Sequence, residues 1–536
     1  MNNSPESIFR EYRDAVSFKT NLGKKGLYEQ SRINERFFVG DQWNGANCGT
    51  DRPLVRHNVI KRIGEFKMSH LNSAKIDVNF SAEGVFNTVS QQEKVRKERA
   101  RLSKEEQAVF PLPENADESA LIVSALNSHY ESTAARTKLD MVLDEALRNA
   151  FISGTGIVYT YFDKDVNTGL YADKTHSTAI KGDIAVQVLK VEDVCFGDPT
   201  ITELQKQPYI IISEQVRAKV LKEEAIKNGL PKEMVNRIGA KFGDKDKITL
   251  LTKLFKVKEA DGEEKVYAIK VLEGMVFREP WYIGISKYPL SVFSWEKRDN
   301  LIYGDSEITY LIPNQIAINR MITASVWSAM TTGMPLMLVN GDAVNGEITN
   351  DPGQIIKVYG SSEEVSSAVK FVTPPDFSKG YNDAVSILIR NTLTQCGAND
   401  AALGNVNPDN TSAIIELREA AAMPLVLQKN RYFRFIEDIA LIWAEFFMKM
   451  YGKRSLKISD ENGVWYIPFD SERYKNLILN VKASAIEEVN SDQGDSVAIL
   501  SQLFEKGAIT ARQYISRLPK GMIPEARALL CELEGE

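Results

Sequence analysis

Residues 305–333, DSEITYLIPNQIAINRMITASVWSAMTTG, are the stretch that decides the fold of this chain. After Glu307 they contain one charged side chain, Arg320, and Pro313 is compatible with a helix only near its start or at a kink. A helix that lacks charge on nearly all sides needs neighbours all round. In a single subunit it would be a deep core helix, which the pattern favours; in an oligomer it would form a wall lined by subunits. The residues at helical spacing are Ile308, Leu311, Gln315, Asn319, Ile322 and Val326.

The residues that follow predict a small β-rich insert and a second helix. Residues 334–376 contain short β-prone runs between Gly, Asn and Pro turns, and such strands leave edges that need a partner. Residues 377–396 return to a helical pattern, and residues 397–410 (GANDAALGNVNPDN) form a loop. The short runs are 336–339, 355–359 and 369–372.

A long helix is predicted from Thr411 to about Tyr451, and Pro424 inside it should cause a kink. Apolar residues repeat along it with near-heptad spacing, which predicts one buried face. These residues are Leu425, Tyr432, Ile436, Ile439, Trp443, Phe446 and Met450.

The N-terminal part of the chain mixes helices and strands, so the predicted fold class is α+β. Residues 117–153 have the pattern of one long helix, which Gly154 and Gly156 end. A hairpin is predicted over residues 455–470, and the tail from residue 484 is helical. Residues 91–106, with six basic and four acidic side chains, predict a solvated helix, a DNA-binding arm being the alternative. Strands are predicted at 157–162, 184–189, 209–213, 248–256, 266–271 and 289–295.

The charge balance argues against a protein that grips nucleic acid by electrostatic attraction. The chain has 66 Lys and Arg against 72 Asp and Glu, a net charge of −6, whereas such proteins show a basic surplus. Residues 1–13 lack the apolar core of a signal peptide, and no run of about eighteen uncharged apolar residues occurs, so no membrane span is expected. Four separated cysteines without a CxxC pattern suit a reducing compartment: Cys48, Cys195, Cys396 and Cys531.

No motif of enzymatic chemistry stands out, so we expect no catalytic residue, metal or cofactor. Residues 452–455 (GKRS) lack the upstream glycine and the Ser or Thr directly after lysine that a P-loop needs. Residues 154–156 (GTG) follow a helix and precede a strand, the reverse of the order in a dinucleotide-binding turn. The histidines have no metal-ligand spacing; they are His57, His70, His129 and His176.

A series of short motifs occurs in order along the chain. The motifs are RFFVGDQW (36–43) with Arg52-Pro53 and Asn58-Val59-Ile60, GTG (154–156) with VYTY (158–161), VCFGDP (194–199), YGDS (303–306) with Pro313, Gln315 and Asn319, and Gly404-Asn405 with Asn410-Thr411-Ser412. From about residue 29 to the C-terminus this ordered set resembles the portal (head–tail connector) proteins of tailed bacteriophages. Residues 81–116 match no element of that family.

The resemblance implies a ring, usually of twelve copies, and a modular subunit. Each subunit would have an α/β wing, a two-helix stem, a small β-rich clip, a long kinked helix and a helical C-terminal crown. On this chain the wing is 1–300, continued by 411–485 with the long kinked helix, the stem helices are 305–333 and 377–396, the clip is 334–376, the channel or tunnel loop is 397–410, and the crown is 486–536.

The function implied by the resemblance is that of a non-enzymatic channel at one capsid vertex, through which double-stranded DNA is packaged and ejected. The implied location is the virion, after assembly in the host cytoplasm. The implied partners are other copies of the chain, the DNA, the large terminase subunit on the clip, head–tail adaptor proteins afterwards, the major capsid protein and the scaffold protein. No membrane partner is expected.

The geometry of the implied ring and the net charge of the chain agree with a channel through which DNA slides. Twelve helices about 10 Å thick enclose a bore of about 28 Å, wide enough for a DNA duplex. Twelve copies at −6 each carry 12 × −6 = −72, so the wall cannot neutralise many phosphates. Lys379 and Arg390 are expected at the DNA backbone, unless they lie outside the bore. The loop residues Asn399, Asn405, Asn407 and Asn410 would offer neutral contacts, and Gln315, Asn319, Ile322 and Val326 would pack between subunits of the stem.

Two other classes of protein stay open. One is a metal-dependent phage nuclease or processing hydrolase, which would be a monomer or dimer with a carboxylate cluster. The other is a different structural ring or adaptor of the head–tail junction, although such chains are usually much shorter.

Overall fold

The computed structural model of the chain divides into two units. The first consists of Met1–Leu71 and Val78–Ala483, and the second of Asn72–Asp77 and Ser484–Glu536. In the second unit, Phe504 and Tyr514 stack with ring centroids 5.1 Å apart. The structure describes residues 3–43, 53–72, 75–82, 118–171, 179–227, 229, 231–241, 246–259, 262–332, 336–339, 344–345, 357–358, 361, 363, 369–372, 378–398, 423–460, 463–471, 479–486, 500–507, 510 and 514.

Two antiparallel sheets form the centre of the first unit. The three-stranded sheet has the order β3-β2-β9 and the five-stranded sheet the order β4-β5-β6-β7-β8. Their facing sides share one apolar core, which includes Ile157 and Leu290 from the first sheet and Ile210 and Leu254 from the second. The strands are β2 (Thr155–Tyr171), β3 (Ala179–Leu189), β4 (Val194–Phe196), β5 (Tyr209–Arg217), β6 (Lys247–Lys258), β7 (Glu264–Leu272), β8 (Met275–Tyr282) and β9 (Leu290–Ser294).

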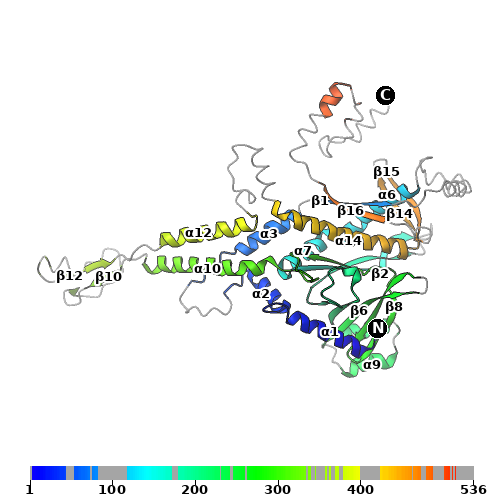
Figure 1. The fold of residues 1–536 in the computed structure, drawn as a ribbon, viewed down its shortest axis with the longest axis horizontal. Coiled ribbons are helices and arrows are strands. Elements are labelled where there is room, and N and C mark those ends of the chain that lie inside the picture. The colour runs from blue at the N-terminus through cyan, green and yellow to red at the C-terminus, as the bar shows by residue number, and fades with distance from the viewer. Residues whose placement is uncertain are drawn as a thin grey trace, which may run out of the picture. The chain divides into compact units, whose positions relative to one another are not determined.

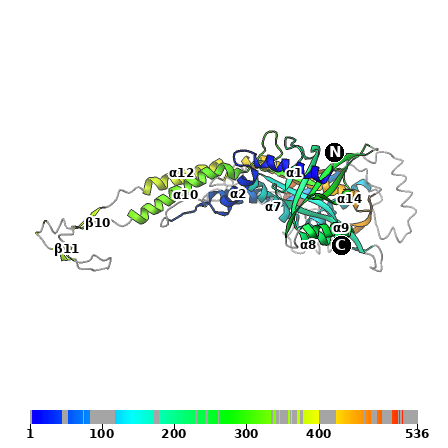
Figure 2. The same cartoon turned by 90° about the horizontal axis from the view of Figure 1, so that it is seen from below.

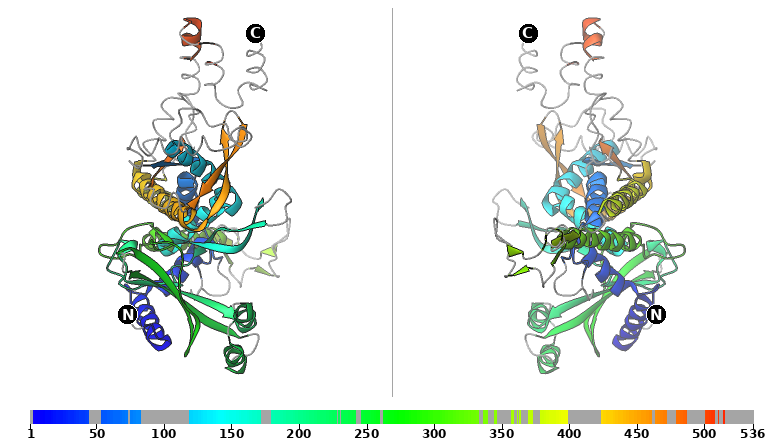
Figure 3. Two further views of the ribbon diagram at one scale, coloured as in Figure 1. Left: turned by 90° about the vertical axis from the view of Figure 1, so that its right-hand side faces the viewer. Right: turned by 90° about the vertical axis from the view of Figure 1, so that its left-hand side faces the viewer.

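Helices cover the outer sides of both sheets (Figure 3). Ile8 of α1 (Pro5–Thr20) packs on the five-stranded sheet, and α8 (Ala218–Lys227) with α9 (Lys232–Lys241) adds a smaller apolar cluster beside it. On the three-stranded sheet, α7 (Leu139–Ser153) contacts β2 and α14 (Val426–Met450) contacts β9. The predicted α+β class is therefore confirmed, as are the six predicted strands.

The single helix predicted over residues 117–153 is wrong. Two helices, α6 (Glu118–Thr137) and α7, meet at Lys138, whose φ of 51° places it in the left-handed region. The break lets α6 pack on the hairpin strand β14 (Lys453–Asp460) while α7 packs on β2. As predicted, Gly154 ends α7; its φ is 87°, and a Cβ there would lie 2.4 Å from the carbonyl oxygen of Gly304.

Two antiparallel helices, α10 (Glu307–Thr332) and α12 (Ser378–Gln395), lie side by side (Figures 1 and 2). Asn314 Nδ2 donates to Thr392 Oγ1 at 3.2 Å, and Ser325 Oγ donates to Asn382 Oδ1 at 3.0 Å. Between the helices, β10 (Leu336–Val339) pairs with β13 (Val369–Val372), and β11 (Val344–Asn345) with β12 (Lys357–Val358). These short strands thus find partners within their own chain.

The described part of the predicted long helix is α14, which begins at Val426. Pro424 lies in a 3₁₀ turn (Met423–Leu425) directly before α14, not inside an α-helix, and residues 411–422 lie outside the described part. The predicted apolar stripe is confirmed, because Leu425, Tyr432, Ile436, Ile439, Trp443 and Phe446 are buried and Met450 is half-buried. The hairpin β14–β15 (Gly463–Asp470) is also confirmed, and β1 (Lys75–Ala82) pairs with β16 (Leu479–Ile486).

The N-terminal region contributes two further helices that support the hairpin of α10 and α12. They are α2 (Leu27–Val39), which contacts α7 and α10, and α3 (Val59–Asn72). Most of the predicted clip, the predicted crown and residues 91–106 lie outside the described residues.

Candidate functional site

The first half of α10 is held by its own chain. Gln315 Oε1 accepts from the backbone N–H groups of Val59 (2.9 Å) and Ile60 (3.3 Å), and Gln315 Nε2 donates to the His57 carbonyl oxygen at 2.7 Å. Asn319 Oδ1 accepts from His57 N at 3.0 Å, and Asn319 Nδ2 donates to a further buried amide, Gln42 Oε1. Both α10 amides are almost fully buried, so their hydrogen-bonding groups are engaged within the chain rather than presented to a neighbour.

The second half of α10 has much less cover. Ile322 and Val326 are half-buried, and Met330 is 63% exposed. Of the side chains described from Arg320 to Met330, only Ser325 is buried, where it bonds α12. Contact between subunits along this half of α10 stays a prediction.

The start of α10 is tied to α3 by a buried ion pair. Glu307 Oε1 lies 2.6 Å from Lys67 Nζ of α3, and Trp295 Nε1 donates to Glu307 Oε2 at 3.1 Å. The two charged side chains are only 10% and 6% exposed. Cys396, at the end of α12, lies beside this pair; burial raises the pKa of its thiol to about 12, and Glu307 adds to the shift. The anchor, defined as Lys67, Trp295, Glu307 and Cys396, thus joins the start of α10 and the end of α12 to α3 and to the residue that follows β9.

Apart from Ile387, which is 58% exposed, the exposed side of α12 is polar and nearly neutral. Arg390 and Asp383 are exposed on it, and the helix carries one more basic residue, Lys379, in its first turn. Nothing is described of the Lys379 side chain, and the predicted loop residues Asn399, Asn405, Asn407 and Asn410 lie outside the described residues. The exposed neutral residues are Asn382, Ser386, Asn391, Thr394 and Gln395.

A cavity of about 540 Å³ opens between β9, α14 and the loops 202–205 and 297–302. No sequence motif predicted this cavity, although Arg431 and Arg434 are three residues apart on one helix. Its half-buried apolar wall includes Leu204, Val292 and Leu301. Five cationic side chains line it, Lys287, Lys297, Arg298, Arg431 and Arg434, together with Glu203 and Asp438.

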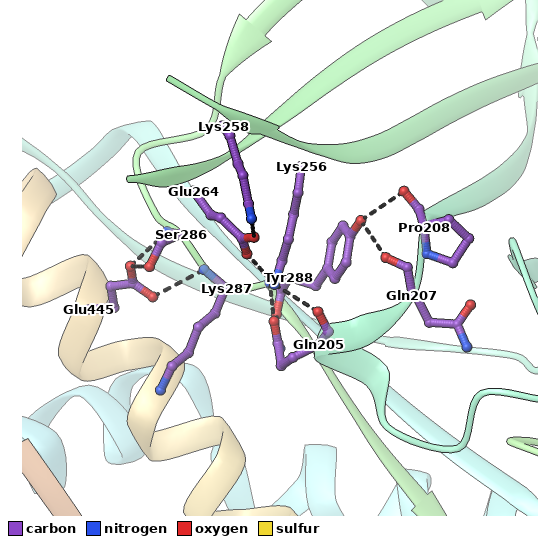
Figure 4. Close-up of polar contacts among 10 residues, drawn as sticks. All are labelled: Gln205, Gln207, Pro208, Lys256, Lys258, Glu264, Ser286, Lys287, Tyr288 and Glu445. Carbon is purple, nitrogen blue, oxygen red and sulfur yellow. Dashed lines mark hydrogen bonds and ion pairs between the residues drawn. The ribbon is translucent and has the colours of Figure 1, made fainter. Parts of the chain in front are cut away.

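One wall of this cavity is held by a network of polar contacts (Figure 4). Glu445 of α14 accepts from Ser286 N at 2.6 Å and from Lys287 N at 3.3 Å. Burial alone would raise the pKa of Glu445, but hydrogen bonds from Lys449 and Ser286 outweigh it and lower the pKa. The carboxylate therefore stays charged and fixes the loop before β9 on α14, so that Lys287 enters the cavity from a rigid backbone.

Tyr288 and Gln205 complete the network on the side of the five-stranded sheet. Tyr288 N donates to Gln205 Oε1 at 2.8 Å, and the buried Tyr288 hydroxyl donates to the Gln207 carbonyl oxygen at 3.0 Å. Lys256 Nζ donates to the Gln205 carbonyl oxygen at 2.7 Å. The loop 202–205 is thereby held against the β9 side of the cavity (Figure 4).

Metal sites and membrane-spanning helices are the other features that bear on function. Among the described residues, no group of three or more His, Cys, Asp and Glu side chains is placed to hold a metal ion. No helix of the described part is long and apolar enough to cross a membrane.

Several chains in solved structures resemble this chain. A chain from the virion of a native gene transfer agent particle aligns with 95% of this chain and 99% of its own length, at 8% identity and a TM-score of 0.34. We draw no functional conclusion from a likeness of this size. The chain matches no family model, and no curated protein matches it.

Proposed function

We propose that this chain is the subunit of a ring at one vertex of a phage capsid, a portal through which double-stranded DNA is packaged and ejected. The observation that carries the proposal is the second half of α10, which has no charged side chain between Met321 and Thr332 and is only half covered in a single chain. Apolar surface of this kind is removed from water most simply by a neighbouring copy.

The exposed side of α12 favours a channel wall that binds DNA only weakly. Amide and hydroxyl groups with few cations give DNA weak contacts, and weak contacts release few counterions. The anchor at Glu307 keeps α10 and α12 fixed on the predicted wing. If the wings of several subunits form a ring, each subunit therefore adds one helical hairpin to the channel wall. The partners that the resemblance implies are the large terminase subunit on the clip, adaptor proteins on the same surface afterwards, and the major capsid and scaffold proteins.

The direct test is the mass and shape of the purified full-length chain. Native mass spectrometry and negative-stain images should give a closed ring of about twelve copies with an axial opening of about 30 Å. A single compact copy, or a monomer that cleaves DNA with Mg²⁺, would overturn the proposal.

A second test concerns residues 397–410. A phage that lacks them should assemble rings but package or retain DNA poorly, because the channel loop would be missing. Normal packaging and retention would remove the loop from the proposal.

Truncation at residue 486 should change assembly or headful length before it changes terminase docking.

A further inference from the structure

The cavity between β9 and α14, here the cationic cavity, concentrates positive charge in a chain whose net charge is −6. Two of its five cations are used locally: Arg298 forms an ion pair with Asp305, and Arg431 Nη1 donates to the Trp295 carbonyl oxygen at 3.2 Å. Lys287, Lys297 and Arg434 form no ion pair with another described residue, although Lys287 lies near Asp438. The cavity therefore offers three cations to a ligand from outside.

A complementary surface lies on α7, here the acidic face. Asp140, Met141, Asp144 and Glu145 are all exposed, and Met141 is 63% exposed. Met141 lies three and four residues before Asp144 and Glu145, so the three side chains share one side of the helix. Their carboxylates form no ion pair with any residue that the structure describes. Lys138, at the break before α7, adds one cation at the end of this face.

We propose that the acidic face of one copy occupies the cationic cavity of the next copy. The inference rests on the proposed ring, because it names the surfaces through which that ring closes. Two different surfaces of one chain that fit each other make a head-to-tail interface, and such an interface closes into a ring when the rotation allows. Asp144 and Glu145 then pair with Lys297 and Arg434, and Met141 fills the apolar part of the cavity.

The composition of the cavity favours a protein segment over a phosphate. Leu204, Val292 and Leu301 would stay uncovered beneath a phosphodiester, whereas a flexible methionine side chain adapts to such a surface. Glu203 and Asp438 would find no cation on a phosphate, whereas Lys138 at the end of the acidic face can pair with one of them. An apolar anchor with flanking charge pairs is also the usual composition of a specific interface.

The test reverses the charges on each side separately. One variant of the full chain carries Lys297→Glu and Arg434→Glu, and the other carries Asp144→Lys and Glu145→Lys. Each alone should form at least roughly tenfold fewer rings than the unchanged chain at about 0.15 M salt, measured by native mass spectrometry, because like charges then face each other. An equal mixture should regain rings, since each reversed surface meets a complementary one.

The controls separate the interface from the ring. Lys219→Glu with Lys232→Glu, two exposed cations on α8 and α9, should leave the ring fraction unchanged. If the unchanged chain forms no ring, the proposed function fails. If it forms rings and either reversal does so equally well, or if the mixture does not recover, the ring stands and the interface proposal is wrong. Unchanged circular dichroism spectra confirm that each variant folds. If one of the two charge-reversal variants does not fold, the ring fraction of the other variant alone tests the interface.

Discussion

The two halves of α10 have similar composition but opposite surroundings (Figure 1). Up to Asn319 one side of the helix is buried in its own chain and its amides bond to residues 57–60, whereas beyond Arg320 its apolar side chains are mostly half-exposed. One charge-poor helix is thus a core element at one end and has much less cover at the other. The core interpretation of its sequence holds for the first half, and a subunit wall is our proposal for the second half alone.

The largest difference in stability between the two halves is expected at the anchor, which holds the first half. Glu307→Gln should lower the free energy of unfolding by about 3–5 kcal/mol, because it leaves the buried Lys67 ammonium without a counter-charge. Urea denaturation, followed by tryptophan fluorescence, measures the loss. The matched control is Glu65→Gln on α3, the helix that carries Lys67. It removes the exposed Lys61–Glu65 ion pair and should cost no more than about 0.5 kcal/mol. Equal losses in both variants would show that burial does not strengthen the anchor.

The stability of the folded chain should also depend on pH, through a buried histidine that lies outside α10. His129 of α6 contacts Tyr451 at 2.9 Å, and burial lowers the pKa of His129 to about 4, while Asp183 acts in the opposite direction. The unfolded chain, with an ordinary pKa of about 6.5, then binds more protons than the folded chain between pH 6.5 and 4.

Stability should therefore be complete above about pH 6.5 and fall by up to about 1.4 kcal/mol per pH unit as pH falls towards 4. Urea midpoints at a series of pH values measure this slope. His129→Gln should flatten it, whereas His57→Gln, an exposed position, should not. A wild-type profile that stays flat over this range would exclude His129 as the source.

A smaller effect is expected from the amides of the first half. Gln315→Leu should cost about 1–3 kcal/mol, since the buried Ile60 N loses its acceptor and Val59 N and the His57 carbonyl oxygen keep only their bond to each other. Gln395→Leu, at an exposed position of α12, should change the unfolding midpoint little. An unchanged midpoint for Gln315→Leu would mean that water replaces the lost bonds.

The smallest effect on stability is expected in the second half. Met330→Glu, at a side chain 63% exposed, should change the free energy of unfolding by less than about 0.5 kcal/mol. In a ring it would bury a charge between subunits and lower the ring fraction in native mass spectra. Ile226→Glu on α8, at a side chain 65% exposed, is the control and should leave the ring intact. Rings that tolerate Met330→Glu would place this half of α10 outside the subunit contact.

Local patterns predicted the regular elements well. The stripe of α14 and the six strands follow from the periodicity of apolar residues, which depends on neighbours in the sequence. The break at Lys138 could not be predicted in the same way, because residues 136–139 (RTKL) contain no glycine or proline. What bends the chain there is the packing of α6 and α7 on different strands, and the strand that α6 contacts, β14, is far away in the sequence.

Long-range contacts also explain what the sequence did not reveal about the candidate site. The environment of Gln315 is set by residues 57–60, and the burial of Lys67 by Glu307 and Trp295. Nothing near these residues in the sequence distinguishes a buried lysine from a solvated one. The cationic cavity collects side chains from two loops, β9 and α14, so no single stretch of sequence displays it.

The long sequence separation within the support of α10 has a consequence for synthesis. Val59 N and Gln315 Oε1 are 256 residues apart in the chain. At about 5–20 residues per second, the ribosome needs roughly 13–50 s to make the partner that residues 57–60 require. Through that interval the nascent N-terminal helices lack the helix that holds them, which is the period in which a chaperone would have most to protect.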